Sequence, residues 1–124
     1  MIEPGKTEKF LQRLIAATKT GKIRWQPEDP PNIPRTGTEE YVGVVYTTTL
    51  SDSLFRLSEV RYRYYTDEDH FVWTETVALE VVDWQGRVFW RFPQSGQILD
   101  LLEAVQYAAS DIEQVMDKVL DEIG

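Results

Sequence analysis

The segment Asp67-Glu68-Asp69-His70 is the only run of side chains in the sequence that looks like a set of metal ligands. Carboxylate oxygens suit hard cations, and a neutral imidazole could add a nitrogen ligand. The spacing of an EF-hand is absent, however, and a short polar turn between two strands has the same composition. We therefore expect a solvated turn here and predict no metal site and no cofactor.

The other residue types that support catalysis lack the neighbours that catalysis requires. His70 is the only histidine, and nothing in its spacing supplies the orienting partner and pocket of a general base. The serines stand outside any G-x-S-x-G context, the glycines form no phosphate loop, and no two carboxylates can be assigned to opposite sides of a cleft. Cysteine is absent, which excludes disulfides and a thiolate nucleophile. The sequence predicts no catalytic residue and a protein that is not an enzyme.

Length and charge narrow the class of function further. The 124 residues are enough for one domain, 1–124, with a single core. The net charge of −8 would repel a polyanion, which disfavours nucleic acid and makes a basic protein partner easier to accommodate. The opening MIEPGKTEKF lacks the pattern of a signal peptide, and no apolar run approaches the roughly 20 residues of a membrane span. These features predict a soluble, cytoplasmic protein that binds no membrane.

The elements that would position any site centre on a hairpin at residues 71–92, whose turn is Asp83-Trp84-Gln85-Gly86. Short turns join four predicted strands, at residues 41–50, 54–65, 71–82 and 87–92. Connections this short cannot form parallel crossovers, so the pattern predicts a four-stranded antiparallel meander.

Helices and a connector flank this meander. A helix is predicted over residues 7–20, followed by a short edge strand at 22–26 and an extended proline-rich connector at 27–40. After Ser95, apolar residues recur every three or four positions, which predicts one long C-terminal helix packed on one sheet face. The alternative is a new helix beginning at the capping-box pattern Ser110-Asp111-Ile112-Glu113. The predicted fold class is α+β.

The first quarter of the chain carries a spaced motif, whose residues are Phe10, Leu14, Ile15, Thr18, Gly21, Ile23 and Trp25. With its T-x-x-G-x-I-x-W ending, this segment resembles the opening of many small, uncharacterised bacterial and phage proteins. The resemblance implies a bacterial or phage source and no particular activity.

Side-chain alternation along the strands, with symmetric turns, assigns even-numbered and odd-numbered residues to opposite faces. The even face is predicted to be the core, covered by the C-terminal helix. The predicted pairs across the three turns are Leu50 with Leu54, Tyr64 with Val72, and Val82 with Val88. Arg56 and Glu80 interrupt it and are predicted to form a charge pair near a sheet edge or end.

The odd face combines aromatic and arginine side chains around an aliphatic patch, which is typical of protein interfaces. Arg61 is expected opposite Glu75, and Arg63 opposite Trp73 in a cation–π contact. The candidate interface residues are Tyr41, Arg61, Arg63, Trp73, Glu75, Val77, Leu79, Phe89 and Arg91, with Trp84 at a hairpin tip. The alternatives are that the connector and first helix cover this face, and that Trp84 packs back onto the sheet.

The function predicted from these features is a non-catalytic, acidic protein-interaction module that binds a protein partner or a second copy of itself through one sheet face. Sharper versions are an immunity-like or antitoxin-like protein that binds a basic toxin, or a dimer that resembles a secretion chaperone. A competing hypothesis is a small-ligand domain with a pocket between sheet and C-terminal helix. Tyr46, Tyr62, Tyr64 and Trp90 would line that pocket.

Overall fold

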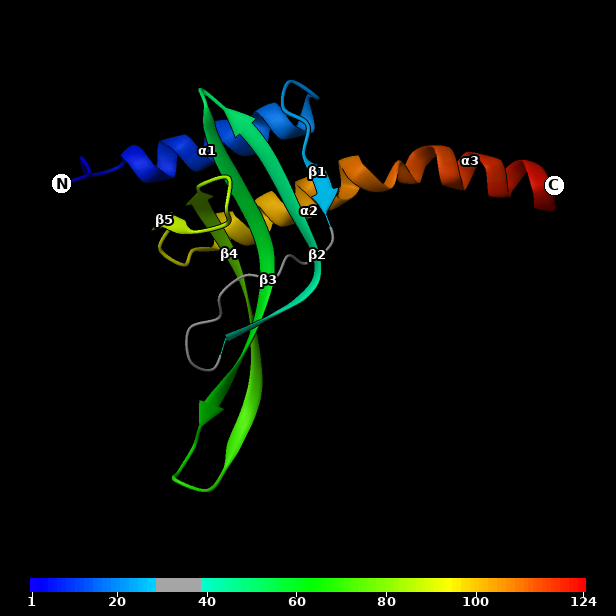
Figure 1. The fold of residues 1–124 in the computed structure, drawn as a ribbon. Helices are drawn as coiled ribbons and strands as arrows, with labels where there is room; N and C mark the ends of the chain where they lie inside the picture. Colours follow the sequence, from blue (N-terminus) through cyan, green and yellow to red (C-terminus); the bar gives the residue numbers. More distant parts are fainter. Residues whose placement is uncertain (29–38) are drawn as a thin grey trace.

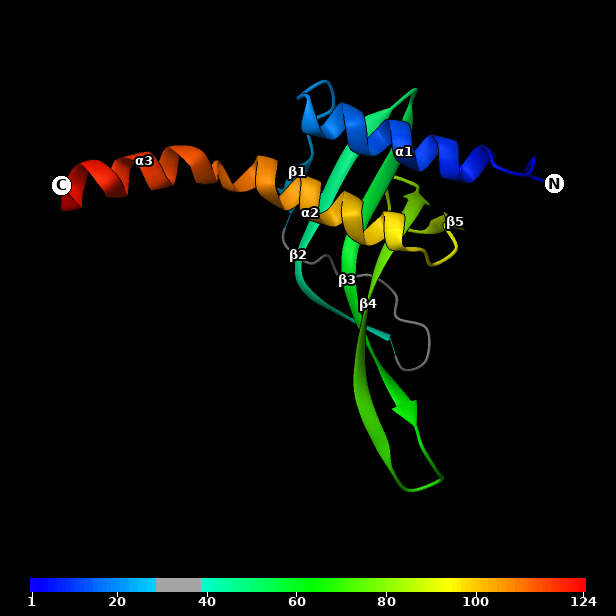
Figure 2. The ribbon, with the colours of Figure 1, turned by 180° about the vertical axis from the view of Figure 1, so that it is seen from behind.

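The computed structural model describes residues 1–28 and 39–124, with only the backbone of residues 39–43. Most of the predicted connector, residues 29–38, therefore lies outside the described residues. In chain order the elements are α1 (Lys6–Lys19), β1 (Gln26–Glu28), β2 (Glu39–Leu50), β3 (Ser53–Tyr65), β4 (Phe71–Val82), β5 (Val88–Arg91), α2 (Gly96–Ser110) and α3 (Ile112–Ile123). Figures 1 and 2 show α1 and α2 side by side across one face of the sheet, so the described chain has two layers.

The sheet is antiparallel throughout, and its spatial order β1-β2-β3-β4-β5 follows the sequence. The α+β class and the meander are confirmed, but the predicted count of four strands is wrong. The short edge strand predicted at residues 22–26 lies further along the chain, at Gln26–Glu28, where it forms the fifth strand and Pro27 lies opposite Tyr46. A proline is tolerated there because an edge strand needs hydrogen bonds on one side only. The two ends of the predicted connector, at residues 27–28 and 39–40, belong to β1 and β2.

The register of β3 against β4 agrees with the predicted pairs: Tyr64 lies opposite Val72, and Arg56 lies opposite Glu80. Val82 also lies opposite Val88 as predicted, although the register shifts between Val81 and Val82.

At the β2–β3 turn the prediction is wrong, because Leu50 lies opposite Ser53 and not opposite Leu54. The turn has two residues, Ser51 and Asp52, both with positive φ (48° and 62°), as a tight primed hairpin turn requires. A second shift falls between Val42 and Tyr46. The two-residue turn places even-numbered residues of β2 opposite odd-numbered residues of β3, and the one-residue shift at Val81/Val82 does the same for Trp90 and Arg91 of β5, so parity does not hold across the sheet. The shift between Val42 and Tyr46 adds two residues to β2 and leaves its parity unchanged.

The helices cover the face that carries the odd-numbered residues of β3 and β4, and the prediction that they cover the even face is wrong. The buried core cluster consists of Leu11, Leu14, Trp25, Tyr46, Phe55, Leu57, Leu79, Ile98, Leu101, Leu102 and Val105. The even-numbered residues Val60, Ala78 and Val82 are buried as well, on the opposite face. Because both faces of the central strands are buried, their hydrophobic pattern did not indicate which face the helices cover.

The T-x-x-G-x-I-x-W motif links α1 to the sheet. Trp25 Nε1 donates to Thr18 Oγ1 (3.1 Å), which in turn donates to the carbonyl of Leu14 (2.9 Å). Gly21 adopts a positive φ of 79°, a conformation that glycine reaches without a Cβ penalty, and the chain reverses there. The motif thus buries a tryptophan whose polar nitrogen has a partner.

The predicted long C-terminal helix is two helices, which meet at Asp111. This residue has a left-handed backbone (φ 53°, ψ 39°) and ends α2 before α3 begins. Asp is among the few residues that tolerate this conformation. The Tyr107 hydroxyl donates to Glu113 Oε1 across the junction, and this hydrogen bond raises the pKa of the Tyr107 phenol. Whereas α2 buries five side chains, α3 buries none and extends away from the sheet (Figure 1).

Candidate functional site

The far half of the β3–β4 hairpin projects beyond the helix layer, as both views of the ribbon show (Figures 1 and 2). We call residues 61–76 the arm. Strand β2 accompanies β3 only as far as the pair Glu39–Tyr62. Beyond that point, the arm is a two-stranded ribbon that no described helix covers.

Aromatic and arginine side chains interlock on one face of the arm. Phe71 lies between Tyr65 and Trp73, with ring centroids 5.7 Å from each. The Arg61 guanidinium carbon lies 4.5 Å from the Trp73 ring centre, and that of Arg63 lies 5.3 Å from it, so the predicted Arg63–Trp73 contact is confirmed. Such cation–π contacts order the side chains. The rings stay accessible, because Trp73 and Phe71 are each 43% exposed.

The opposite face of the arm is apolar and exposed as well. Tyr64 and Val72 lie opposite one another there and are 58% and 52% exposed. A two-stranded ribbon is only marginally stable alone in water. Exposed apolar side chains on both of its faces are therefore a feature that a binding partner would bury.

The outer edge of β4 is open along the arm. Strand β5 pairs with β4 only at Glu80, Val81 and Val82, and Phe92 N donates to the Leu79 carbonyl just beyond. Residues 71–76 have no strand on that side among the described residues. An open edge presents backbone N–H and C=O groups to which another strand can bond.

The turn at the arm's tip holds the residues predicted as a solvated turn. Asp67 Oδ1 accepts from Asp69 N (2.9 Å) and lies 2.8 Å from His70 Nδ1. The hydrogen bond to His70 lowers the pKa of the Asp67 carboxyl. The side chains are exposed, and residues 1–28 and 39–124 include no group of three His, Asp or Glu arranged to hold a metal ion.

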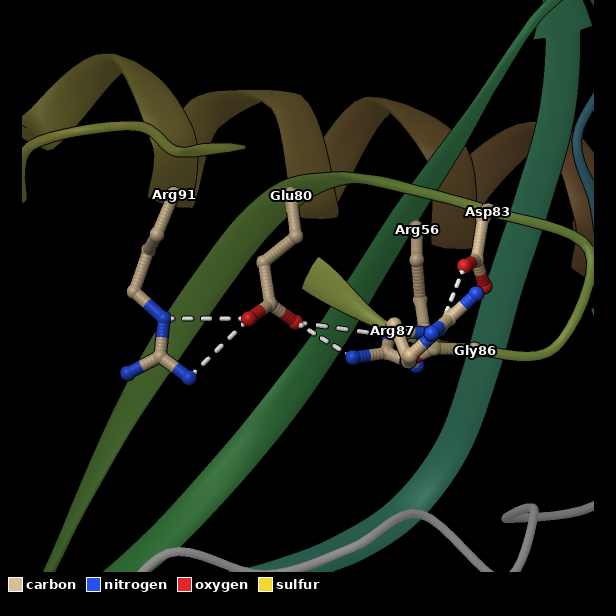
Figure 3. Close-up of polar contacts among 6 residues, drawn as sticks. All are labelled: Arg56, Glu80, Asp83, Gly86, Arg87 and Arg91. Carbon is tan, nitrogen blue, oxygen red and sulfur yellow. Dashed lines mark hydrogen bonds and ion pairs between the residues drawn. The ribbon is translucent and has the colours of Figure 1, made fainter. Parts of the chain in front are cut away.

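A buried ionic network occupies the face of the sheet away from the helices (Figure 3). Glu80 is fully buried; its Oε1 accepts from Arg56 Nη2 (3.0 Å) and its Oε2 from Arg91 Nε (3.0 Å). Arg56 Nη1 also donates to the Gly86 carbonyl in the β4–β5 turn (3.3 Å). The predicted Arg56–Glu80 pair is confirmed: it joins β3 and β4 close to the strand ends at Ser53 and Val82, and both side chains are buried.

The β4–β5 turn is held by Asp83, which accepts from the backbone N–H groups of Gln85 and Arg87 (2.9 Å each) and from Arg87 Nε (2.7 Å). The Arg87 N–H lowers the pKa of the Asp83 carboxyl. Trp84 at this turn is 74% exposed. It therefore offers an exposed aromatic surface at the end of β4 opposite to the arm's tip.

The ten predicted interface residues fall into four groups. Arg61, Arg63, Trp73 and Glu75 lie together on the arm; Trp84, Phe89 and Arg91 are exposed near β5. Leu79 is fully buried under the helices and Val77 packs against the core, so these two cannot meet a partner. The side chain of Tyr41 lies outside the described residues.

The alternative ligand pocket is not formed by its predicted residues. Tyr46 and Trp90 share the helix-covered face through their pairs with Leu57 and Val81. Tyr62 and Tyr64 belong to the opposite face, where they pair with Thr74 and Val72. The two-residue β2–β3 turn and the register shift between Val81 and Val82 explain the difference, because they reverse the parity of β2 and β5 relative to β3 and β4.

Sequence reasoning missed the arm as a unit. Tyr65, Phe71 and Val72, which are exposed at its end, were not among the candidate residues, and Tyr64, which is exposed there too, was assigned to the alternative pocket. A signal was present in strand length: β3 and β4 have 13 and 12 residues, whereas β5 has four. Long strands beside a short one must extend past it.

Comparison with protein-family models, curated proteins and solved structures finds no match. No helix in residues 1–28 and 39–124 has both the length and the apolar character to cross a bilayer.

Proposed function

We propose that the protein is a non-catalytic interaction module whose arm binds an extended segment of a partner protein. The observation that carries this proposal is the combination of an open β4 edge with exposed Phe71 and Trp73 beside it. Strand addition uses both features, because backbone hydrogen bonds supply affinity and alternate side chains supply specificity. A two-stranded arm is only marginally stable alone, so a partner strand that buries it would also stabilise the arm.

Charge favours a basic segment as the partner. The chain carries −8 overall, and the arm presents Glu75 and the acidic turn residues Asp67, Glu68 and Asp69. Arg61 and Arg63 are already stacked on aromatic rings. Complementary charge raises the association rate and disfavours acidic partners. An immunity-like or antitoxin-like role is the form of this proposal in which the basic segment belongs to a toxin.

A selection of random 12-residue peptides on the immobilised full chain tests the proposal. We expect enriched peptides to be basic and rich in β-branched or aromatic residues at alternate positions. Trp73→Ala should weaken their binding at least tenfold, because a buried aromatic anchor contributes more than about 1.4 kcal/mol. Trp84→Ala is the matched control: it removes an exposed tryptophan away from the arm and should leave affinity unchanged.

Amide hydrogen exchange locates the bound strand. Slower exchange along residues 71–76 on peptide addition is expected if the β4 edge accepts the peptide. Binding at the arm would be refuted if Trp73→Ala and Trp84→Ala lost the same amount of peptide affinity. It would also be refuted if peptide slowed amide exchange only in the helices.

A further inference from the structure

Helix α3 has an apolar side with no partner among the described residues. Val115, Met116, Val119, Leu120 and Ile123 recur at helical spacing and are between 46% and 73% exposed. A 12-residue helix is marginal in water without a surface to pack on. Asp111 has a left-handed backbone conformation, and the helix that follows it extends away from the sheet and the other two helices (Figures 1 and 2).

A complementary apolar groove lies at the other end of the molecule, beside the first turns of α1. It has a volume of about 670 Å³, and its inner wall is built from Phe10, Phe55, Val81, Trp90 and Phe92. Lys6 stands on its rim and also borders a neighbouring hollow of about 520 Å³ that Lys9 and Arg13 line. Glu3 also borders both hollows. The groove is therefore apolar inside, and three basic side chains outnumber one carboxylate along one side.

The charges of the two helices are complementary. Helix α1 carries four basic side chains and one acidic one, and α3 carries four acidic side chains and one basic one. On a helical projection, Glu113 and Glu122 flank the apolar side of α3. If two α3 helices instead paired with each other, eight acidic side chains would be brought together.

The groove of the same chain is out of reach for α3. The groove lies near the start of α2, whereas α3 begins after its end, and α2 has 15 residues, which span about 22 Å. Figure 1 places the two chain termini at opposite ends of the molecule. The α3 that fills the groove must therefore belong to a second copy.

We propose that the protein forms a two-fold symmetric dimer in which α3 of each copy occupies the groove beside α1 of the other. Two copies lying antiparallel place each acidic helix next to a basic one, and the same contact forms twice. Each contact then needs to bury only about half of the roughly 1,600 Å² of a standard interface. Because the arm takes no part in this contact, it stays available for the partner described above.

Light scattering over a concentration series provides the first test. We expect twice the chain mass at micromolar concentration, and a dissociation constant raised at least tenfold by Leu120→Glu, which puts a charge on the apolar side of α3. Tyr64→Glu is the matched control, since it changes an equally exposed residue on the arm and should leave the dimer intact. Circular dichroism checks that both variants are folded.

A charge exchange tests the pairing of helices. Lys9→Glu with Arg13→Glu should weaken the dimer, and adding Asp117→Lys with Glu122→Lys in the same chain should restore it.

The absence of cysteine allows the contact to be mapped directly. Mixed Lys6→Cys and Leu120→Cys copies should form a disulfide-linked heterodimer under mild oxidation, and mixed Tyr64→Cys and Leu120→Cys copies should not. A monomer at 100 µM would overturn the proposal. A dimer unaffected by Leu120→Glu, or a dimer lost in Tyr64→Glu, would overturn it as well. So would a mass that keeps increasing with concentration, because that is the behaviour of an open chain of copies.

Discussion

Replacing Glu80 by glutamine should destabilise the fold by about 3–5 kcal/mol, because the change leaves buried arginine charge uncompensated. Glu80 is fully buried and accepts from Arg56 and Arg91, and the Arg56 side chain is itself only 3% exposed. Arg91 is 37% exposed and can turn toward water, so most of the cost should come from Arg56. A chain of this length has a total stability of roughly 6–19 kcal/mol, so the loss is a large fraction of it.

Urea unfolding followed by tryptophan fluorescence measures this loss. With a slope near 2 kcal/mol/M, the midpoint should fall by roughly 2 M. Glu75→Gln is the control, because it changes an exposed carboxylate on the same strand and should cost less than about 0.5 kcal/mol. Replacing Arg56 and Glu80 together by methionine and leucine should recover most of the stability. A loss below 1 kcal/mol for Glu80→Gln would refute the view that this carboxylate neutralises Arg56.

Three further results are expected. The pKa of Asp83 is lowered in the folded state, so its carboxylate contributes to stability above about pH 4, and this contribution is lost as the pH falls through the folded-state pKa. Asp83→Asn should therefore reduce the difference between the urea midpoints measured at pH 7 and at pH 3. Glu113→Gln should return the pKa of Tyr107 toward its ordinary value, and an ultraviolet absorbance titration would show this change. An unchanged titration would mean that the contact across the helix junction is absent in solution. Leu79→Ala should cost about 2–5 kcal/mol in urea unfolding and Trp90→Ala clearly less, because Leu79 is fully buried and Trp90 is 45% exposed; the reverse order would contradict the observed burial of these two side chains.

Much of the fold could be predicted from local patterns. Runs of β-branched and aromatic residues with short polar turns indicated the meander, and the turn at residues 66–70 placed Arg56 opposite Glu80 and Arg63 opposite Trp73. These predictions succeeded because β3 and β4 pair without interruption over twelve residue pairs.

The assignment of faces failed for reasons that single-residue patterns do not express. Ser51 and Asp52 form a tight turn with positive φ although neither is glycine, and this two-residue turn reverses the parity of β2 relative to β3. The register shift between Val81 and Val82 reverses the parity of β5 relative to β4. The break at Asp111 was predicted only as the alternative, from the capping-box pattern, because the apolar spacing continues through it and favoured one long helix. The candidate site was predicted in part: Trp73 and its arginine neighbours were identified, but their exposure depends on β3 and β4 extending past β5.

The order of strands in the sheet has a consequence for how the chain reaches its native state. Every strand pairs with its neighbour in sequence, so the sheet needs only short loop closures, which are fast and low in entropic cost. The helix layer is different, because α1 and α2 are in contact although most of the sequence separates them. The hydrogen bond that Gln97 Nε2 donates to the Glu8 carbonyl spans 89 residues. Closure of α1 onto α2 is therefore the long-range step, and the meander forms the surface on which that step takes place.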